Sequence, residues 1–148
     1  MTPVLFYSHR QGEYAAFSNW YPAQFVLNDH TFENSEQAMM FYKSFDVDYR
    51  RKVLKTSDPA RVKKLGRECK MRDNWDGVKF DVMVKVCFAK FSQNPDLREL
   101  LLSTGERPVH EDCEDKWWGG GPNHPHGKDL LGKVLIRVRT LLREDRTP

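Results

Sequence analysis

Glu36 is the carboxylate whose position best suggests chemistry. It follows Asn34 and Ser35, which are typical of a helix start, so it should lie in the first helical turn, with Lys43 nearly in line seven residues later. A carboxylate in a first turn can simply complement the helix dipole, and this interpretation stays open. The functional interpretation is that Glu36 faces a pocket, where it orients water or stabilises a cationic transition state.

Two further candidates combine polar groups with aromatic rings. In the stretch Phe17–Trp20, Ser18 and Asn19 stand between two aromatic residues. Ser and Asn in a turn usually cap the backbone, but they can also hydrogen-bond a ligand while a ring covers a flat base. Trp75 has the same two interpretations, because a ring at a helix start either packs into the core or stacks on a base.

The stretch Asp115–Gly121 is the hardest to explain by packing alone. It places Trp117 and Trp118 beside three consecutive glycines, which cost entropy on folding and supply nothing to a core. Two such rings would expose apolar surface unless they line something, and glycines let backbone N–H groups approach phosphate oxygens. A ring, a carboxylate and a glycine loop together favour a nucleotide or nucleoside phosphate as ligand.

Other common chemistries lack their sequence motifs. The chain has no phosphate-binding P-loop, no dinucleotide-binding glycine motif, no nucleophile elbow and no His-Glu-x-x-His pair. Four potential zinc ligands lie near one loop, but their spacing is not that of a structural zinc site: His110, Cys113, His124 and His126. We therefore expect no metal.

Composition limits the class of protein. The 148 residues suffice for one domain with its own core, and 39% hydrophobic with 30% charged residues exclude a disordered chain. A net charge of +3 permits an anionic ligand but is lower than a dedicated nucleic-acid binder carries. Three widely spaced cysteines, no signal peptide and no apolar run of bilayer length predict a cytoplasmic protein without a membrane partner.

The elements that position these residues should be short strands followed by helices. Apolar runs and turn residues predict strands at 4–8, 23–27 and 109–111. Apolar spacing and caps predict helices at 34–45, from 59 onward, at 75–91, 95–103 and 130–142, and an irregular loop at 117–127. Helices 75–91 and 130–142 should form the core. The expected fold is α+β, a predominantly helical single domain over residues 1–148 with a small N-terminal β-sheet.

Motifs in order along nearly the whole chain resemble the NADAR superfamily, to which the YbiA-like N-glycosidases belong. They run from about Phe17 to Arg139, and the ordered set is specific although each motif alone is weak. The set comprises FSNW at 17–20, Ser35-Glu36, Lys43, Trp75, Lys90-Phe91-x-Gln93-Asn94-x-x-Leu97, Leu101, Thr104, Glu111, Asp115-x-x-Trp118-Gly119-x-Gly121, and Gly127-x-x-x-Leu131-Gly132 followed by Arg139.

The resemblance implies an N-glycosidase that needs neither a metal nor a cofactor. Its implied substrates are N-ribosyl phosphates such as early intermediates of riboflavin biosynthesis. Alternatives are the removal of ADP-ribose from guanine in nucleotides or nucleic acid, and a non-catalytic module that binds NAD or ADP-ribose. The implied catalytic residues are Glu36, Trp75 and Asp115, and the implied substrate-binding residues are Ser18, Asn19, Lys43, Trp118 and Gly119.

This chain also departs from the family pattern. Asp129 stands where the family usually has Asn, the interval between Glu111 and Asp115 is one residue short, and Trp117 adds a second ring. These changes fall beside the presumed pocket, so they bear on the substrate more than on the reaction class.

Overall fold

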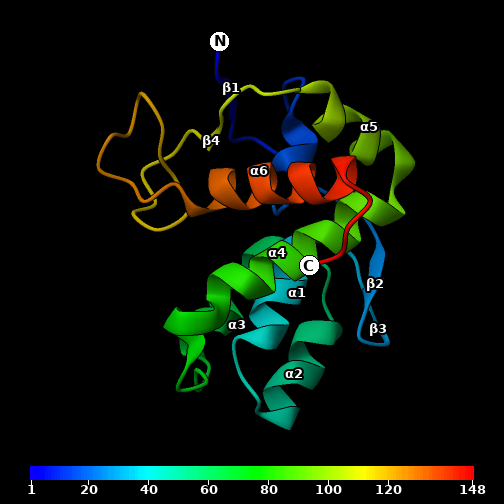
Figure 1. Ribbon diagram of the computed structural model, residues 1–148. Coiled ribbons are helices and arrows are strands. Elements are labelled where there is room, and N and C mark those ends of the chain that lie inside the picture. Colours follow the sequence, from blue (N-terminus) through cyan, green and yellow to red (C-terminus); the bar gives the residue numbers. More distant parts are fainter.

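The computed structural model describes all 148 residues as a mostly helical α+β fold. Figure 1 shows α6 crossing one half of the molecule, with α4, α1, α3 and α2 in the other half. The elements are β1 (Val4–Phe6), the short 3-10 helix η1 (Ala15–Phe17), β2 (Phe25–Leu27), β3 (His30–Phe32), α1 (Ser35–Tyr42), α2 (Val47–Leu54), α3 (Pro59–Glu68), α4 (Trp75–Gln93), α5 (Pro95–Ser103), β4 (Val109–Glu111) and α6 (Leu130–Arg143).

The strands form two separate pairs. β2 and β3 make an antiparallel hairpin whose turn residues, Asn28 and Asp29, both have positive φ, as a tight two-residue turn requires. β1 and β4 pair in parallel, with Val4 opposite Val109 and Phe6 opposite Glu111. The small amount of β-structure that was predicted is therefore present, as two pairs: β1 takes its partner from the second half of the chain, and β2 pairs with β3, which was not predicted.

The predicted helix over 34–45 ends early, and another helix follows it. Asn34 caps α1 by accepting a hydrogen bond from the backbone N–H of Gln37 (2.8 Å), as the pattern suggested. The helix ends at Tyr42, and Asp46 then caps α2 by accepting the N–H of Tyr49 (2.8 Å). α2 was not predicted from the sequence, because the segment is highly charged and has too few apolar residues to show a helical repeat.

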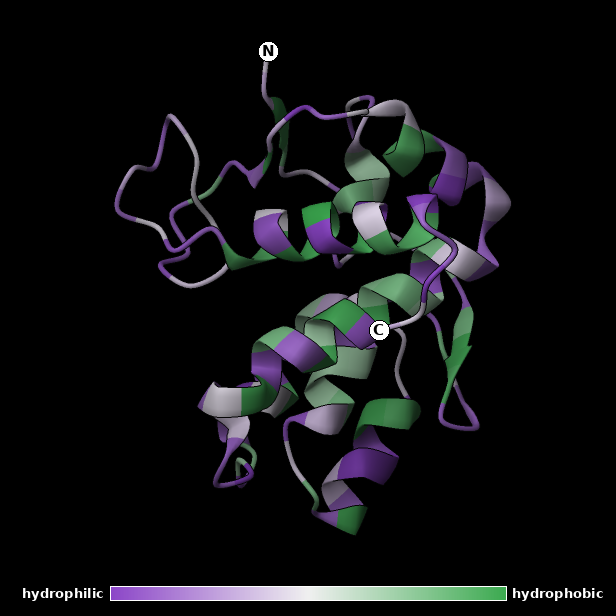
Figure 2. Cartoon of the chain, viewed as in Figure 1, coloured by the Kyte–Doolittle hydropathy of each residue, from purple (hydrophilic) through white to green (hydrophobic).

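The two predicted core helices are confirmed, and α4 packs directly on α6. The residues of α6 alternate around the helix between hydrophobic and hydrophilic, as Figure 2 shows. Its buried stripe faces buried side chains of α4, and the two sets include Leu131, Val134, Leu135, Val138 and Leu141 on α6 and Met83, Val86, Cys87 and Phe91 on α4. No helix is both long enough and apolar enough to cross a bilayer.

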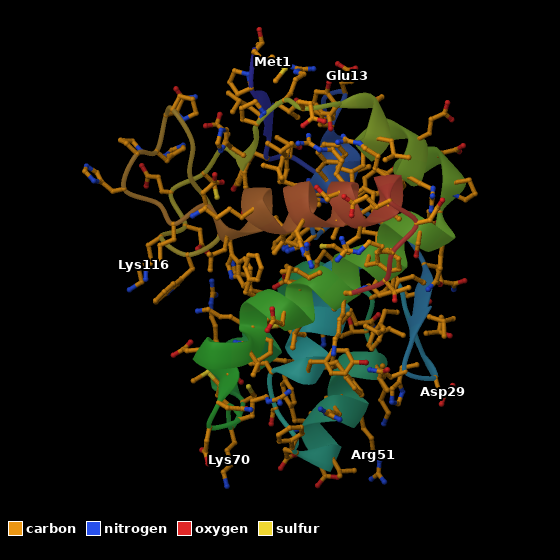
Figure 3. All side chains as sticks on the ribbon, viewed as in Figure 1. Met1, Glu13, Asp29, Arg51, Lys70 and Lys116 are labelled. Atoms are coloured by element: carbon orange, nitrogen blue, oxygen red, sulfur yellow. The ribbon has the colours of Figure 1, made fainter.

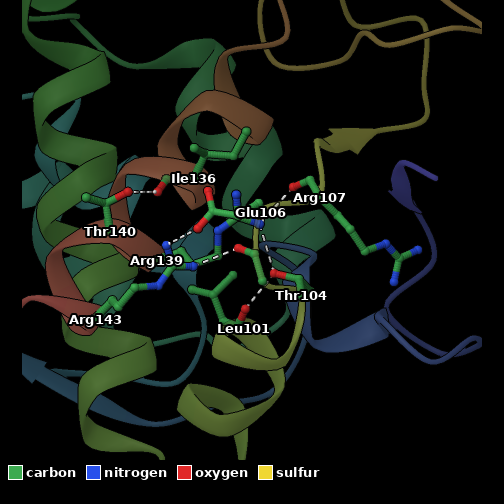
Figure 4. Close-up of polar contacts among 9 residues, drawn as sticks. Leu101, Thr104, Glu106, Arg107, Ile136, Arg139, Thr140 and Arg143 are labelled. Atoms are coloured by element: carbon green, nitrogen blue, oxygen red, sulfur yellow. Dashed lines mark hydrogen bonds and ion pairs between the residues drawn. The ribbon is translucent and has the colours of Figure 1, made fainter. Parts of the chain in front are cut away.

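A buried arginine ties α6 to the segment that leads into β4. Nη1 of Arg139 donates to Oγ1 of Thr104 (2.9 Å) and to the carbonyl of Arg107 (2.8 Å), as drawn in Figure 4. One turn later, Nη1 of Arg143 pairs with Oε1 of Glu106 (2.6 Å). These contacts fix the start of β4 and so the position of Glu111 at its end.

Candidate active site

One cavity of about 800 Å³ lies among the N-terminal loops, α1, α3, α4 and the loop after β4. Figure 3 shows the loop that carries Lys116 and the segment that carries Lys70 on the same side of the molecule. Seven of the eight site residues expected from the sequence line this cavity: Ser18, Asn19, Glu36, Lys43, Trp75, Asp115 and Trp118. All four tryptophans of the chain line it as well: Trp20, Trp75, Trp117 and Trp118.

Glu36 contributes a carboxylate that can change its protonation near neutral pH. It lies in the first turn of α1, where its backbone N–H donates to the carbonyl of Asn19 (3.0 Å). None of the ion pairs in the protein includes it. Burial raises the pKa of Glu36 to about 7, although the positive charges of Lys63 and Lys43 act in the opposite direction. Such a group can accept a proton from water at physiological pH.

The turn at Ser18 and Asn19 presents an unsatisfied acceptor. Oγ of Ser18 accepts the N–H of Trp20 (3.2 Å), and its carbonyl accepts Nζ of the buried Lys90 (3.0 Å). Burial lowers the pKa of Lys90 to about 8. The side-chain oxygen of Asn19 is buried without any partner, although Asn19 lines the cavity. Because an unpaired buried acceptor is costly, this oxygen is available to a donor group of a ligand.

The cavity has a basic side, formed where α1 approaches α3. Nζ of Lys43 donates to the carbonyl of Gly66 (2.9 Å), and Lys63 and Arg67 of α3 line the cavity beside it. A side chain at Gly66 would collide with that of Met40, so glycine permits this close approach. Residues 43–72 hold 11 of the 24 Lys and Arg residues but only four of the 21 Asp and Glu. Three of these eleven residues, Lys43, Lys63 and Arg67, line the cavity and give this side of it a positive charge.

The loop after β4 is held together largely by its own backbone. Oδ1 of Asp115 accepts the N–H groups of both Trp117 and Trp118 (2.9 Å each), and the Asp115 side chain is exposed. The carbonyls of the two tryptophans in turn accept the N–H groups of Leu130 and Leu131, which start α6. The loop thus caps α6 while it presents both rings to the cavity.

Trp117 is also held by lysines. Nζ of Lys79 lies 3.8 Å and Nζ of Lys128 3.9 Å from the centre of its ring. Lys79 is buried, lines the cavity and pairs with Asp76 (3.2 Å). Trp117, which departs from the family pattern, therefore forms part of the cavity wall.

Gly119 is the one expected site residue that does not line the cavity. Its N–H donates to the carbonyl of Asp115 (2.9 Å), its carbonyl accepts the N–H of Asp129, and an added Cβ would collide with Cys113. Gly121 has φ +93° and packs against His110. These glycines allow the loop to pack tightly on its neighbours, and an approach of their backbone to a ligand stays a prediction.

Glu111 lines the cavity and was not among the expected site residues. Burial raises its pKa to about 7, and the nearby charge of Asp115 acts in the same direction. Its strand is only three residues long, so no alternation pattern in the sequence showed which way its side chain faces. The other cavity residues not expected from the sequence include Tyr7, His9, Arg10, Lys63, Arg67 and Lys79.

The loop histidines pair with carboxylates. Nδ1 of His110 lies 2.6 Å from Oδ2 of Asp129, and Nε2 of His124 lies 3.3 Å from Oδ1 of Asp112. No three His, Cys, Asp or Glu side chains are grouped closely enough to hold a metal ion. Asp129, the second departure from the family pattern, therefore helps to fix β4 against the loop.

Several known proteins are similar to this chain over most of its length. N-glycosidase YbiA of Escherichia coli is 35% identical over 144 residues, which cover 95% of this chain and 89% of that protein. N-glycosidase R617 of Acanthamoeba polyphaga mimivirus is 37% identical, covering 83% of this chain and 85% of the relative. Riboflavin biosynthesis protein VVA0006 of Vibrio vulnificus is 32% identical, covering 96% of this chain but 39% of that longer protein.

The fold is similar as well. The NMR structure of E. coli YbiA matches with a TM-score of 0.88 at 34% identity, over 97% of this chain and 86% of that one. The family model for the NADAR domain matches residues 5–143, which include all the residues of the cavity. The resemblance noted in the sequence is confirmed, and the chain belongs to the NADAR domain family.

Proposed function

We propose that this protein is an N-glycosidase that hydrolyses the bond between ribose and an amine nitrogen in N-ribosyl phosphates, such as early intermediates of riboflavin biosynthesis. The names of its relatives, two N-glycosidases and one riboflavin biosynthesis protein, support the reaction class and this substrate. The observation that carries the proposal is the setting of Glu36: a carboxylate that titrates near neutral pH, in a cavity lined by four tryptophans and bordered by basic residues.

Each part of the cavity has a role in this reaction. Cleavage of a ribose C1′–N bond passes through a transition state with positive charge on the sugar, which an adjacent carboxylate stabilises. In our assignment Glu36 supplies this charge and activates the attacking water. Trp75 and Trp118 enclose the base, Asn19 accepts a hydrogen bond from it, and Lys43, with Lys63 and Arg67, binds the phosphate.

The test is a panel of N-ribosides incubated with the purified protein. It contains an aminopyrimidine N-riboside 5′-phosphate, ADP-ribosylated guanosine, NAD and an ordinary nucleoside 5′-phosphate, with released base and sugar phosphate measured by mass spectrometry. We expect the aminopyrimidine riboside to be cleaved fastest. Tight binding of one compound with no release from any of them would identify a binding module and contradict the enzymatic proposal.

One observation favours a second candidate, the removal of ADP-ribose from guanine. Residues 43–72 contain more Lys and Arg than the three of that segment that line the cavity, Lys43, Lys63 and Arg67, and a single phosphate needs no more than those three. A diphosphate or a nucleic-acid strand would use the additional charge. Release of guanosine from ADP-ribosylated guanosine, faster than release from the aminopyrimidine riboside, would favour this candidate.

A further inference from the structure

We propose that Glu111 is the general acid of this site and protonates the departing amine, while Glu36 accepts a proton from the attacking water. The inference rests on the proposed N-glycosidase function and adds to it the assignment of both proton transfers. It starts from a residue whose type does not fit its place in the fold.

Glu111 occupies a strand position that faces the protein interior. In β4, side chains alternate between the two faces of the strand, so Glu111 shares a face with the fully buried Val109, whereas His110 faces the other way and pairs with Asp129. Its partner across the pair is Phe6, which is also buried. A carboxylate at a core-facing position costs folding free energy, so its presence there indicates a function. Here the interior opens into the cavity.

The backbone holds Glu111 on both sides. β4 pairs with β1 on one side, and the carbonyl of Glu111 accepts the N–H groups of Gly120 (3.0 Å) and Cys113 (2.9 Å) on the other. The N–H of Asp112 donates to the carbonyl of Phe6 (2.8 Å). The carboxyl group is therefore held on a rigid element, as a group that must meet a leaving nitrogen requires.

Asp115, the second acid expected from the sequence, is less suited to this role. Its Oδ1 already accepts two backbone N–H groups of the loop, and its side chain is exposed to solvent. It holds the turn that carries Trp117 and Trp118. Its negative charge contributes to the site mainly through its effect on Glu36 and Glu111.

The charges around the two glutamates divide the roles between them. Burial raises the pKa of both to about 7. The neighbours of Glu36 are mainly cations, Lys63, Lys43 and Arg67, which favour its ionised form. The charges that act on Glu111 include the anions Asp115 and Glu36, which favour its protonated form, whereas a hydrogen bond with the Cys113 thiol and the charge of Lys63 act in the opposite direction. Because cations predominate around Glu36 and anions around Glu111, which also occupies the core-facing strand position, we assign the shared proton to Glu111.

The proton balance closes without any further reactant. The C1′–N bond breaks with its electron pair going to nitrogen, which takes the proton of the Glu111 carboxyl group. Water adds its oxygen to C1′ and gives a proton to the Glu36 carboxylate. The products are the free amine and the 1-hydroxy sugar, and transfer of one proton from Glu36 to Glu111 through solvent restores the starting state.

The test is the pH dependence of kcat/KM for the aminopyrimidine riboside phosphate in wild type, Glu111→Gln, Glu36→Gln and Asp115→Asn. We expect a bell-shaped profile in wild type, with an acid limb from Glu36 and an alkaline limb from Glu111. Glu111→Gln should lower the maximum at least about a hundredfold and abolish the alkaline limb, because glutamine has the same shape but no transferable proton. Glu36→Gln should abolish the acid limb. The exposed Glu99→Gln, on α5, is the matched control with an unchanged profile.

The outcomes separate this inference from the proposed function. If wild type hydrolyses no riboside, the proposed function fails and the inference fails with it. If wild type is active and Glu111→Gln keeps its alkaline limb, Glu111 is not the acid, whatever the change in rate. Loss of that limb in Asp115→Asn alone would assign the acid to Asp115 and overturn the proposal. Thermal unfolding of each variant shows whether a lost rate reflects a lost fold.

Discussion

Arg139 and Glu36 are both charged residues inside the protein, and their surroundings are opposite in kind. The Arg139 guanidinium, only 4% exposed, donates to Thr104 and to the carbonyl of Arg107, and Thr104 in turn donates to Leu101 (2.6 Å). Glu36 forms no ion pair and faces a cavity in which the amide oxygen of Asn19 also lacks a partner.

The two charged groups serve different purposes. A buried charge whose hydrogen bonds are complete holds neighbouring segments in one arrangement, and here it holds α6 to the start of β4. A charge that faces a cavity without a partner lowers the stability of the protein, and it becomes useful when a ligand binds beside it. Removing Arg139 should therefore lower stability, and removing the charge of Glu36 should lower activity.

The largest effect should come from removing the charge of Glu36. Glu36→Gln keeps the size and helix propensity of the side chain, so the variant should fold. It loses the negative charge that stabilises the ribosyl cation and the base that activates water, so kcat should fall at least about a hundredfold. Steady-state release of the base measures this, and binding of the substrate should persist. If kcat is unchanged, another carboxylate must perform this role.

Arg139→Met tests the other half of the comparison. It removes the guanidinium, its buried hydrogen bond to Thr104 and the donor of the part-buried carbonyl of Arg107, so the free energy of unfolding should fall by about 2–3 kcal/mol. Urea unfolding measures the loss, and the exposed Arg137→Met on the same helix is the control. At a temperature where the variant is folded, its kcat should stay within about twofold of wild type. A selective loss of kcat would show that the Arg139 network takes part in catalysis.

The same contrast explains what the sequence could predict. Long helices with repeated apolar spacing, such as α4 and α6, were predicted nearly to their ends because burial of one face determines their place. The site residues expected from the sequence lie where type and local context agree, as with Glu36 at a capped helix start. Lys63 and Arg67 on α3, and Glu111, were missed because only tertiary packing turns their side chains toward the cavity.

The glycine loop shows a second limit of prediction from sequence. Three consecutive glycines suggested a backbone that approaches phosphate, but two of their neighbours in space are Cys113 and Asp129 of the chain itself. Sequence alone does not distinguish a backbone that must approach a ligand from one that must approach its own fold. Motif residues such as Gln93 also belong to packing, since its side chain pairs with both backbone groups of Val26 (2.7 Å each).

Trp118→Ala should weaken binding more than it affects chemistry. A stacked base contributes about 1–3 kcal/mol, so affinity should fall by roughly five- to a hundredfold. Titration calorimetry on the Glu36→Gln background avoids turnover, and Trp118→Phe, which keeps an aromatic face, should recover most of the affinity. Equal affinities in a folded Trp118→Ala variant would show that the ring only supports the loop.

The stability of Glu36→Gln should depend on pH. Because the folded pKa of Glu36, about 7, lies above its ordinary value of 4.5, folding favours the protonated form. Wild type therefore loses this contribution as pH rises from about 4.5 through 7, whereas glutamine does not titrate. We expect Glu36→Gln to be more stable than wild type by about 3 kcal/mol at pH 8 and nearly equal to it at pH 4. A destabilised variant at pH 8 would mean that the ionised carboxylate has a partner inside the protein.

The smallest effect should come from Lys79 and Lys128, whose ammonium groups contact the ring of Trp117 in the cavity wall. Like Arg139, both lysines have a partner within the protein. Lys128 is exposed, and its ammonium group forms a cation–π contact with the ring of Trp117. Lys128→Met should therefore lower the free energy of unfolding by about 0.5–1 kcal/mol. Lys79→Met should cost more, because Lys79 is buried and also pairs with Asp76.

A double-mutant cycle between Lys128→Met and Trp117→Leu, followed by urea unfolding, isolates the contact from general effects of charge. A coupling energy of about 0.5 kcal/mol or more would place Trp117 among the groups that hold the loop. Zero coupling, together with weaker substrate binding by Trp117→Leu, would instead place this ring with Glu36, among the groups kept for the ligand.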